Sequence, residues 1–91
     1  NKIEQLINYE EVVRIRCRAH NVRGVAWSVA LMLIERPYMT SPWIQKHFSI
    51  SAPAANAVLA KLVNIGILRE TTGGKYRRLF VADEVFHIIE S

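Results

Sequence analysis

The chain has 91 residues, a length that suits one domain built round a single core. Its apolar content of 51% is too high for a disordered chain, and no apolar run reaches the roughly 18 residues that a membrane-spanning helix needs. Twelve Lys and Arg against eight Asp and Glu give a formal net charge of +4, a mild bias towards anionic partners that identifies none of them.

Two helices are predicted in the first part of the chain. Over residues 2–20, apolar side chains recur at three- and four-residue steps with charges between them, which is typical of an amphipathic helix. These side chains are Ile3, Leu6, Ile7, Val13 and Cys17. After a break at 21–24, residues 25–36 are apolar on nearly all sides, as expected of a central helix. Pro37 disfavours helix at Arg36 and is expected to end the segment.

A helix–turn–helix pair is predicted next. Ser41, placed before a proline, is expected to be the N-cap of a short helix over 42–48. Ser51 is expected to cap a longer helix over 52–65, which stops at Gly66 in the left-handed conformation. The buried stripe of the longer helix is expected to be Ala55, Val58, Leu59, Leu62 and Ile65.

Beyond this helix the sequence period becomes typical of strands. Residues 67–71 and 76–81 are predicted to form a hairpin with its turn at 72–75, and Asp83 is expected to cap a final short helix. The sequence therefore predicts a mostly α fold with a small β-hairpin, the winged helix-turn-helix. Residues 52–65 occupy the recognition-helix position, and the hairpin is the wing.

One long segment carries a resemblance to a known family. It contains E-R-P at 35–37, S-x-P-x-A at 51–55 and, as its most specific part, G-I-L-R-E-x-T-G at 66–73, followed by an arginine-rich strand and an acidic-apolar helix. The matching residues are Glu35, Arg36, Pro37, Ser51, Pro53, Ala55, Leu62, Gly66, Ile67, Leu68, Arg69, Glu70, Thr72, Gly73, Arg77, Arg78 and Phe80. Residues 25–90 thus resemble the C-terminal winged-helix extension of bacterial Fic-family proteins.

The resemblance implies an upstream catalytic domain, which in this family commonly transfers AMP from ATP to a hydroxyl of a target protein. Its signature, a His followed by a Gly-Asn-Gly-Arg phosphate loop, does not occur in this chain. We therefore expect residues 1–24 to be a connector helix and residues 25–91 a winged-helix domain that is not an enzyme and holds no cofactor. The implied partners are the upstream Fic catalytic domain or a second copy of the chain, as a homodimer.

The wing is the first candidate site. Lys75, Arg77 and Arg78 are suited to phosphate contact, and Tyr76 to packing on a sugar. The competing interpretation is a solvated hairpin. Successive strand residues face opposite ways, so Arg77 and Arg78 cannot share a face, and one of them pairs with Glu70.

The recognition helix weakens the case for DNA. Among its outward positions Asn56 and Lys61 are suited to base or phosphate contact, whereas Asn64 lies too near the C-terminal end. The remaining outward positions are Ala52, Ala57 and Ala60, which suit close packing against another protein. Ser51 is open to two interpretations: a helix cap, or part of an anion site at the helix N-terminus.

Other features favour structural roles. The basic end of the first helix is interpreted as a solvated face, and its apolar stripe as a surface that favours a dimer. Cys17 is expected to be a buried thiol in a reducing cytoplasm, and with His20 it supplies too few ligands for a metal site. The large aromatic residues interpreted as core are Trp27, Trp43, Phe48, Phe80 and Phe86.

The expected function is that of a non-catalytic binding or regulatory domain. It would dock a protein domain or a second copy of the chain, with weak nucleic-acid contact at most. The alternative is a transcriptional regulator that grips duplex DNA with the wing and the helix over 52–65. No arrangement of a nucleophile with a base favours an enzyme.

Overall fold

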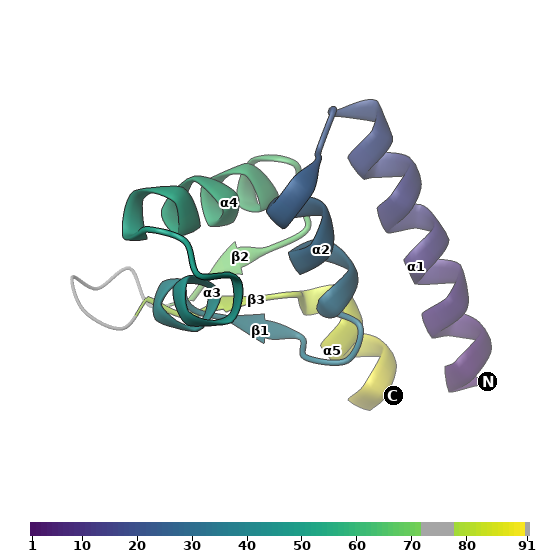
Figure 1. The fold of residues 1–91 in the computed structure, drawn as a ribbon. Coiled ribbons are helices and arrows are strands. Elements are labelled where there is room, and N and C mark those ends of the chain that lie inside the picture. The colour runs from purple at the N-terminus through teal and green to yellow at the C-terminus, as the bar shows by residue number, and fades with distance from the viewer. Residues whose placement is uncertain (72–77, 91) are drawn as a thin grey trace.

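A computed structural model describes residues 1–71 and 78–90. The elements within them, in chain order, are α1 (Lys2–Ala19), α2 (Gly24–Met32), β1 (Tyr38–Met39), α3 (Ser41–Phe48), α4 (Ala52–Asn64), β2 (Arg69–Glu70), β3 (Phe80–Val81) and α5 (Asp83–Glu90) (Figure 1). The fold is mostly helical with a small antiparallel sheet, as the sequence predicts. The succession α3, α4 and the β2–β3 hairpin is that of a winged helix-turn-helix.

Three helices end in the same way, with a residue in the left-handed conformation. Asn21 after α1, Ser49 after α3 and Gly66 after α4 have φ values of 56°, 54° and 81°. In each case the amide of the next residue donates to a carbonyl five residues earlier, at 2.9, 3.1 and 2.9 Å respectively. This hydrogen bond satisfies a carbonyl that the helix leaves without a partner and turns the chain sharply back. The predicted role of Gly66 is confirmed.

Two of the predicted helix starts are wrong by one residue. Thr40, and not Ser41, is the N-cap of α3: its hydroxyl accepts a hydrogen bond from the Trp43 amide at 3.3 Å. The Asp83 carboxylate does not cap α5, because it is bound to the Arg69 guanidinium at 2.7 and 3.0 Å. The Ser41 hydroxyl instead accepts a hydrogen bond from Nε2 of Gln45 at 3.1 Å.

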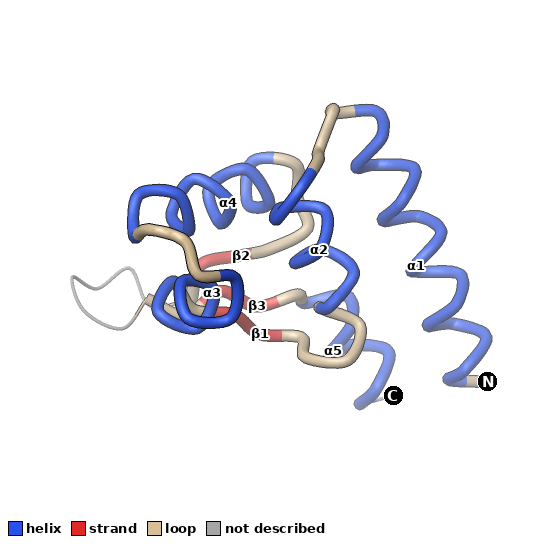
Figure 2. The backbone as a smooth tube through the Cα atoms, viewed as in Figure 1, coloured by secondary structure: helices blue, strands red, loops and turns tan. Residues whose placement is uncertain are grey.

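The sheet has a strand that the sequence did not predict. Its order is β1–β3–β2, all antiparallel (Figure 2). Tyr38 pairs with Val81, and the Ala82 amide donates to the Pro37 carbonyl at 2.8 Å. Helix α2 ends at Met32, before the predicted end at residue 36. The chain continues in hydrogen-bonded turns as far as Arg36, whose amide donates to the Met32 carbonyl at 2.9 Å.

The predicted buried stripe of α4 is nearly correct. Its members are buried in the core except Val58, which is half-buried and packs against it. Of the aromatic residues predicted to be core, Phe80 is buried, whereas Trp27, Trp43, Phe48 and Phe86 are half-buried. The core lies between the helices and the sheet, and all five described helices contribute a buried side chain to it, α3 through Ile44.

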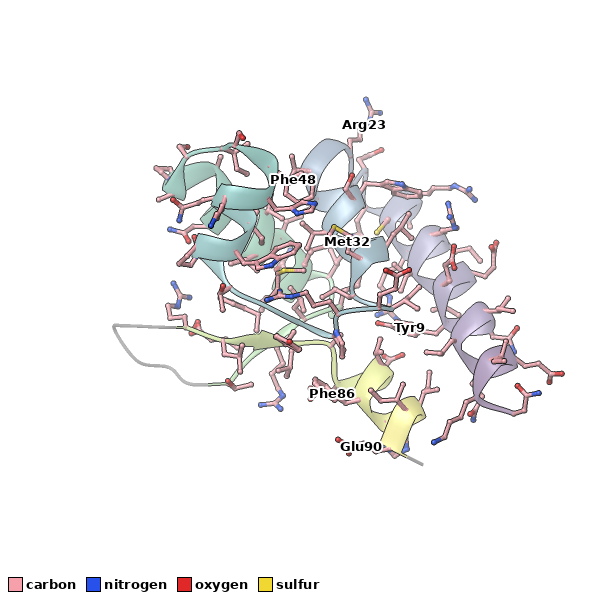
Figure 3. All side chains as sticks on the ribbon, turned by 60° about the horizontal axis from the view of Figure 1, so that its bottom comes forward. Tyr9, Arg23, Met32, Phe48, Phe86 and Glu90 are labelled. Atoms are coloured by element: carbon pink, nitrogen blue, oxygen red, sulfur yellow. The ribbon has the colours of Figure 1, made fainter. Side chains whose placement is uncertain are left out.

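The apolar stripe of α1 is only partly buried. Val13 and Cys17 join the core together with Tyr9, which faces the rest of the molecule (Figure 3). In contrast, Ile3 and Ile7 are 70% and 61% exposed. Burial raises the pKa of the Tyr9 hydroxyl to about 12, with a smaller contribution from the Glu84 carboxylate. The stripe therefore divides into a core part and a part open to solvent.

Candidate functional site

The predicted wing contacts are only partly within the described chain. Lys75, Tyr76 and Arg77 lie outside the described residues, and so does the predicted turn at 72–75. Arg78 is described: its Nε donates to Oε2 of Glu70 at 2.7 Å, and its guanidinium lies 5.4 Å from the centroid of the Phe80 ring. The prediction that one wing arginine pairs with Glu70 is thus confirmed for Arg78.

This ion pair changes the electrostatics at the base of the wing. Arg78 is exposed, but its charge is opposed at contact distance by the carboxylate of Glu70 on the neighbouring strand. A phosphate approaching Arg78 would have to displace this carboxylate or share the guanidinium with it. Arg78 therefore presents little free positive charge to a ligand.

Two shallow hollows lie beside α4, and both are lined by Asn56, Arg78 and Phe80. The larger hollow, of about 550 Å³, lies between α4 and the sheet and is completed by Leu59, Ala60, Val63, Asn64 and Glu70. The smaller, of about 360 Å³, extends towards the start of α3 and is completed by Ser41, Pro42, Gln45 and Ala52. The floor is largely apolar, and the polar groups stand around it.

The outward face of α4 is much as predicted. Asn56, Ala57, Ala60 and Asn64 are exposed, but Lys61 is half-buried and lies about 140° round the helix from Asn56. The predicted DNA contacts Asn56 and Lys61 therefore do not share a surface. Val63, which was not predicted as an outward residue, is 38% exposed and lines the larger hollow. Its position three residues after Ala60 was the available signal.

Ser51 has the structural role. It is the N-cap of α4, and its Oγ accepts a hydrogen bond from the Ala54 amide at 3.2 Å. It is not among the residues that line the hollows at α4. Of the predicted site residues, the structure brings together only Asn56 and Arg78 within the described chain.

A stack of flat side chains on α3 was not predicted. The Arg36 guanidinium lies 4.5 Å from the Tyr38 ring centroid and 4.2 Å from that of Trp43, and it donates to the Tyr38 carbonyl at 2.9 Å. His47 stacks on Trp43 with ring centroids 4.5 Å apart. Arg36 therefore fastens the turn after α2 to α3, and the aromatic rings cover the core from outside.

The described residues with nucleophilic or metal-binding chemistry are dispersed. Cys17 is fully buried, and burial raises the pKa of its thiol, which keeps it protonated. Among the residues that the structure describes, no three His, Cys, Asp or Glu side chains gather as a metal site would require. In the same part of the chain, no helix combines the length and apolar character needed to cross a membrane.

The chain was compared with known proteins in three ways. No protein-family model, no curated protein sequence and no solved structure matches it. The resemblance to the Fic extension therefore rests on the residue pattern alone.

Proposed function

We propose that this chain is a non-catalytic winged-helix docking module that binds a second copy of itself through the outward face of α4. The observation that carries the proposal is the composition of that face. The larger hollow beside α4 has an apolar floor of Leu59, Ala60, Val63 and Phe80, of which Ala60 and Val63 are exposed, and Arg78 at its edge is already bound to Glu70. Such a surface favours a protein partner over the phosphates of DNA.

Small side chains suit this face to another helix. Ala57 and Ala60 are exposed on α4, and neither has an atom beyond Cβ to hold a partner at a distance. Helix axes can approach to 8–10 Å or less, roughly, where the contacting side chains are small. The hollow between α4 and the sheet then receives larger side chains, such as Val63 of the second copy.

The polar groups on either side of Ala60 are compatible with twofold symmetry. Asn56 and Asn64 lie four residues before and four residues after Ala60. In an antiparallel α4–α4 pair centred on Ala60, the Asn56 level of one copy meets the Asn64 level of the other. Each amide both donates and accepts, so this pairing needs no second residue type. The commitment to a second copy rests on this self-complementarity.

The family resemblance supports the wider role. If the chain is the extension of a Fic-family protein, as its G-I-L-R-E-x-T-G run suggests, dimerisation through α4 would hold two upstream catalytic domains in a fixed relation. Residues 1–24 would connect each domain to its module. The proposed setting is the cytoplasm, in keeping with a single, buried, protonated Cys17.

The proposal is tested by the oligomeric state of the chain and of two charged variants. Sedimentation equilibrium should show a reversible dimer. The Ala60→Glu variant places two carboxylates near the twofold axis, which costs several kcal/mol, so self-association should weaken at least about 100-fold. The matched variant Ile7→Glu introduces the same charge on the exposed part of α1 and should leave the dimer intact.

The two variants also separate the competing surfaces. If Ile7→Glu dissociates the dimer and Ala60→Glu does not, the interface is α1, as the sequence analysis first suggested, and the α4 proposal is wrong. A chain that stays monomeric at the highest attainable concentration excludes the second copy as partner. The upstream catalytic domain, added as a separate protein, would then be the partner to measure.

Binding of DNA by α4 and the wing is the second candidate, because Asn56 and Arg78 line the same hollows. It predicts that Lys75→Ala, Arg77→Ala and Arg78→Ala together abolish binding of duplex DNA at low salt. Retention of binding in this triple variant would exclude the wing as the DNA-contacting element.

A further inference from the structure

One segment of the chain is rich in arginine and has no acidic residue. Residues 12–34 contain four arginines, so they carry a formal charge of +4. Residues 61–78 form a second basic segment, in which five Lys and Arg stand against Glu70 alone. Anions are therefore attracted to the end of α1, the turn and α2 as well as to the segment that includes the wing.

Helix packing brings three of these arginines to one side of the α1–α2 hairpin. The two helices lie side by side and run antiparallel (Figure 1). The Arg14 guanidinium lies 5.8 Å from the centroid of the Trp27 ring, which sets the level at which the helices meet. One turn nearer the connection, α1 carries Arg18 and α2 carries its N-cap residue Arg23. We call Arg14, Arg18 and Arg23 the arginine patch.

The patch contains cations with little compensation. Arg14 is paired with Glu10, its Nη2 lying 2.8 Å from the carboxylate. The side chains of Arg18 and Arg23 are exposed, and neither guanidinium group has a hydrogen-bond or ion-pair partner among the described residues. Arg23 points away from the body of the molecule (Figure 3). Glu10 and Glu11, nearer the N-terminus, mark the edge of the patch. Two guanidinium groups are thus available to an anion.

The turn between the helices holds the patch in place. The Val22 amide donates to the Cys17 carbonyl at 2.9 Å, and both residues are buried, with Asn21 in the left-handed conformation between the helices. The backbone that carries Arg18 and Arg23 is therefore fixed before a ligand arrives. Only side-chain freedom remains to be lost on binding.

We propose that the arginine patch binds the phosphate backbone of duplex nucleic acid without reading its sequence. Guanidinium groups match phosphate oxygens in geometry as well as charge. None of the hollows at α4 includes a patch residue, and Trp27 is half-buried beneath Arg14. An acidic protein segment would thus find charge but no pocket for an apolar anchor, whereas a duplex backbone needs charge alone.

The test measures binding of the chain to a fluorescent duplex of random sequence at several salt concentrations. With two phosphates neutralised, affinity should fall about 12-fold between about 50 and about 200 mM salt. The Arg18→Ala/Arg23→Ala variant should reduce the slope of log affinity against log salt by about two units. The Arg18→Lys/Arg23→Lys variant, which keeps both charges, should retain most of the slope.

A matched control removes the same charge elsewhere. Lys2→Ala/Lys46→Ala also lowers the formal net charge by two, at exposed positions outside the patch, and should leave most of the slope. Equal losses in the two double variants would mean that net charge alone drives binding, and the patch proposal would be wrong. Absence of binding at the lowest salt, or loss only in the Lys75→Ala/Arg77→Ala variant, would also overturn it.

Two further arms complete the experiment. A polyglutamate chain of similar charge should bind more weakly than the duplex, and tighter binding of polyglutamate would identify an acidic protein as the partner instead. Repeating the titration with Ala60→Glu keeps this result separate from the dimer proposal, because the patch lies outside α4 and should bind duplex in the monomer as well.

Discussion

In the α1–α2 hairpin Arg18 and Arg23 project into solvent, whereas in the winged half, residues 35–90, the described arginine side chains are held by the fold. Arg36 stacks between two aromatic rings, Arg69 binds Asp83 through two nitrogens, and Arg78 binds Glu70. Arg18 and Arg23 of the hairpin have no such contacts among the described residues. Residues of one type thus stabilise structure in one region and remain available to a ligand in the other.

The difference teaches that arginines without a partner among the described residues lie away from the wing. Residues 12–34 carry a formal charge of +4, and the α4 face is apolar at its floor. The two proposed partners, a phosphate backbone and a second copy of the chain, are therefore assigned to different surfaces. Because the patch residues and the residues lining the α4 hollows are separate sets, we expect that binding one partner does not exclude the other.

The largest expected effect comes from a test of whether the two regions unfold as one unit. Leu62→Ala removes a fully buried side chain of α4 and should lower the free energy of unfolding by about 2–5 kcal/mol. The Trp27→Phe variant keeps only Trp43, which reports on the winged half, and the Trp43→Phe variant keeps only Trp27, which reports on the hairpin. The unfolding of each variant is followed in a urea titration. Both should give the same shifted midpoint, since one core joins the regions. Two separate transitions would show that the hairpin unfolds independently.

The next effect concerns the two kinds of arginine directly. Arg36→Ala removes a charged hydrogen bond and two ring contacts and should cost about 2 kcal/mol in the free energy of unfolding. Arg18→Ala, in the hairpin, should change it by less than about 0.5 kcal/mol. Thermal and urea unfolding of the two variants provide the measurement. Comparable losses would remove the contrast between the regions.

A smaller effect separates capping from ligand binding at Ser51. Ser51→Ala should destabilise the chain by about 1 kcal/mol because the Ala54 amide loses its acceptor. Affinity for duplex DNA, measured at one salt concentration in the folded variant, should not change. A large loss of affinity with unchanged stability would instead place Ser51 in an anion site.

The smallest effect is the pH dependence of the exposed Arg69–Asp83 pair. A side-chain hydrogen bond from Arg69 lowers the pKa of the Asp83 carboxyl below its ordinary value of 3.8. The pair therefore contributes stability above that ordinary value, and the contribution is lost as pH falls through the lowered pKa. Asp83→Asn should be less stable than the parent chain near neutral pH, and the difference should shrink in acid. A difference that grows on acidification would contradict this assignment.

The sequence predicts the helices and the wing well because their signals are local. The cap at Ser51, the left-handed Gly66 and the buried stripe of α4 follow from spacing within one helix. Strand β1 was missed because two residues carry no period, and their conformation is set by pairing with β3, about forty positions away.

The candidate site was predicted less completely, also for physical reasons. The pairing of Arg78 with Glu70 followed from strand alternation, and the exposed alanines followed from helical period. The separation of Asn56 from Lys61 by about 140° follows from the same helical period. The arginine patch depends on how α1 meets α2, a long-range contact of Arg14 with Trp27 that no spacing in the sequence specifies.

The residues at the three helix ends differ in the steric cost of their left-handed backbone conformation. Asn21 and Ser49 occupy the left-handed region that Gly66 adopts without steric cost. Each folded molecule therefore holds a small backbone strain at two turns, which neighbouring hydrogen bonds oppose. A glycine would relieve the strain at either turn but would also give the unfolded chain more freedom. The identity of each turn residue thus sets a balance between order in the native state and entropy in the unfolded one.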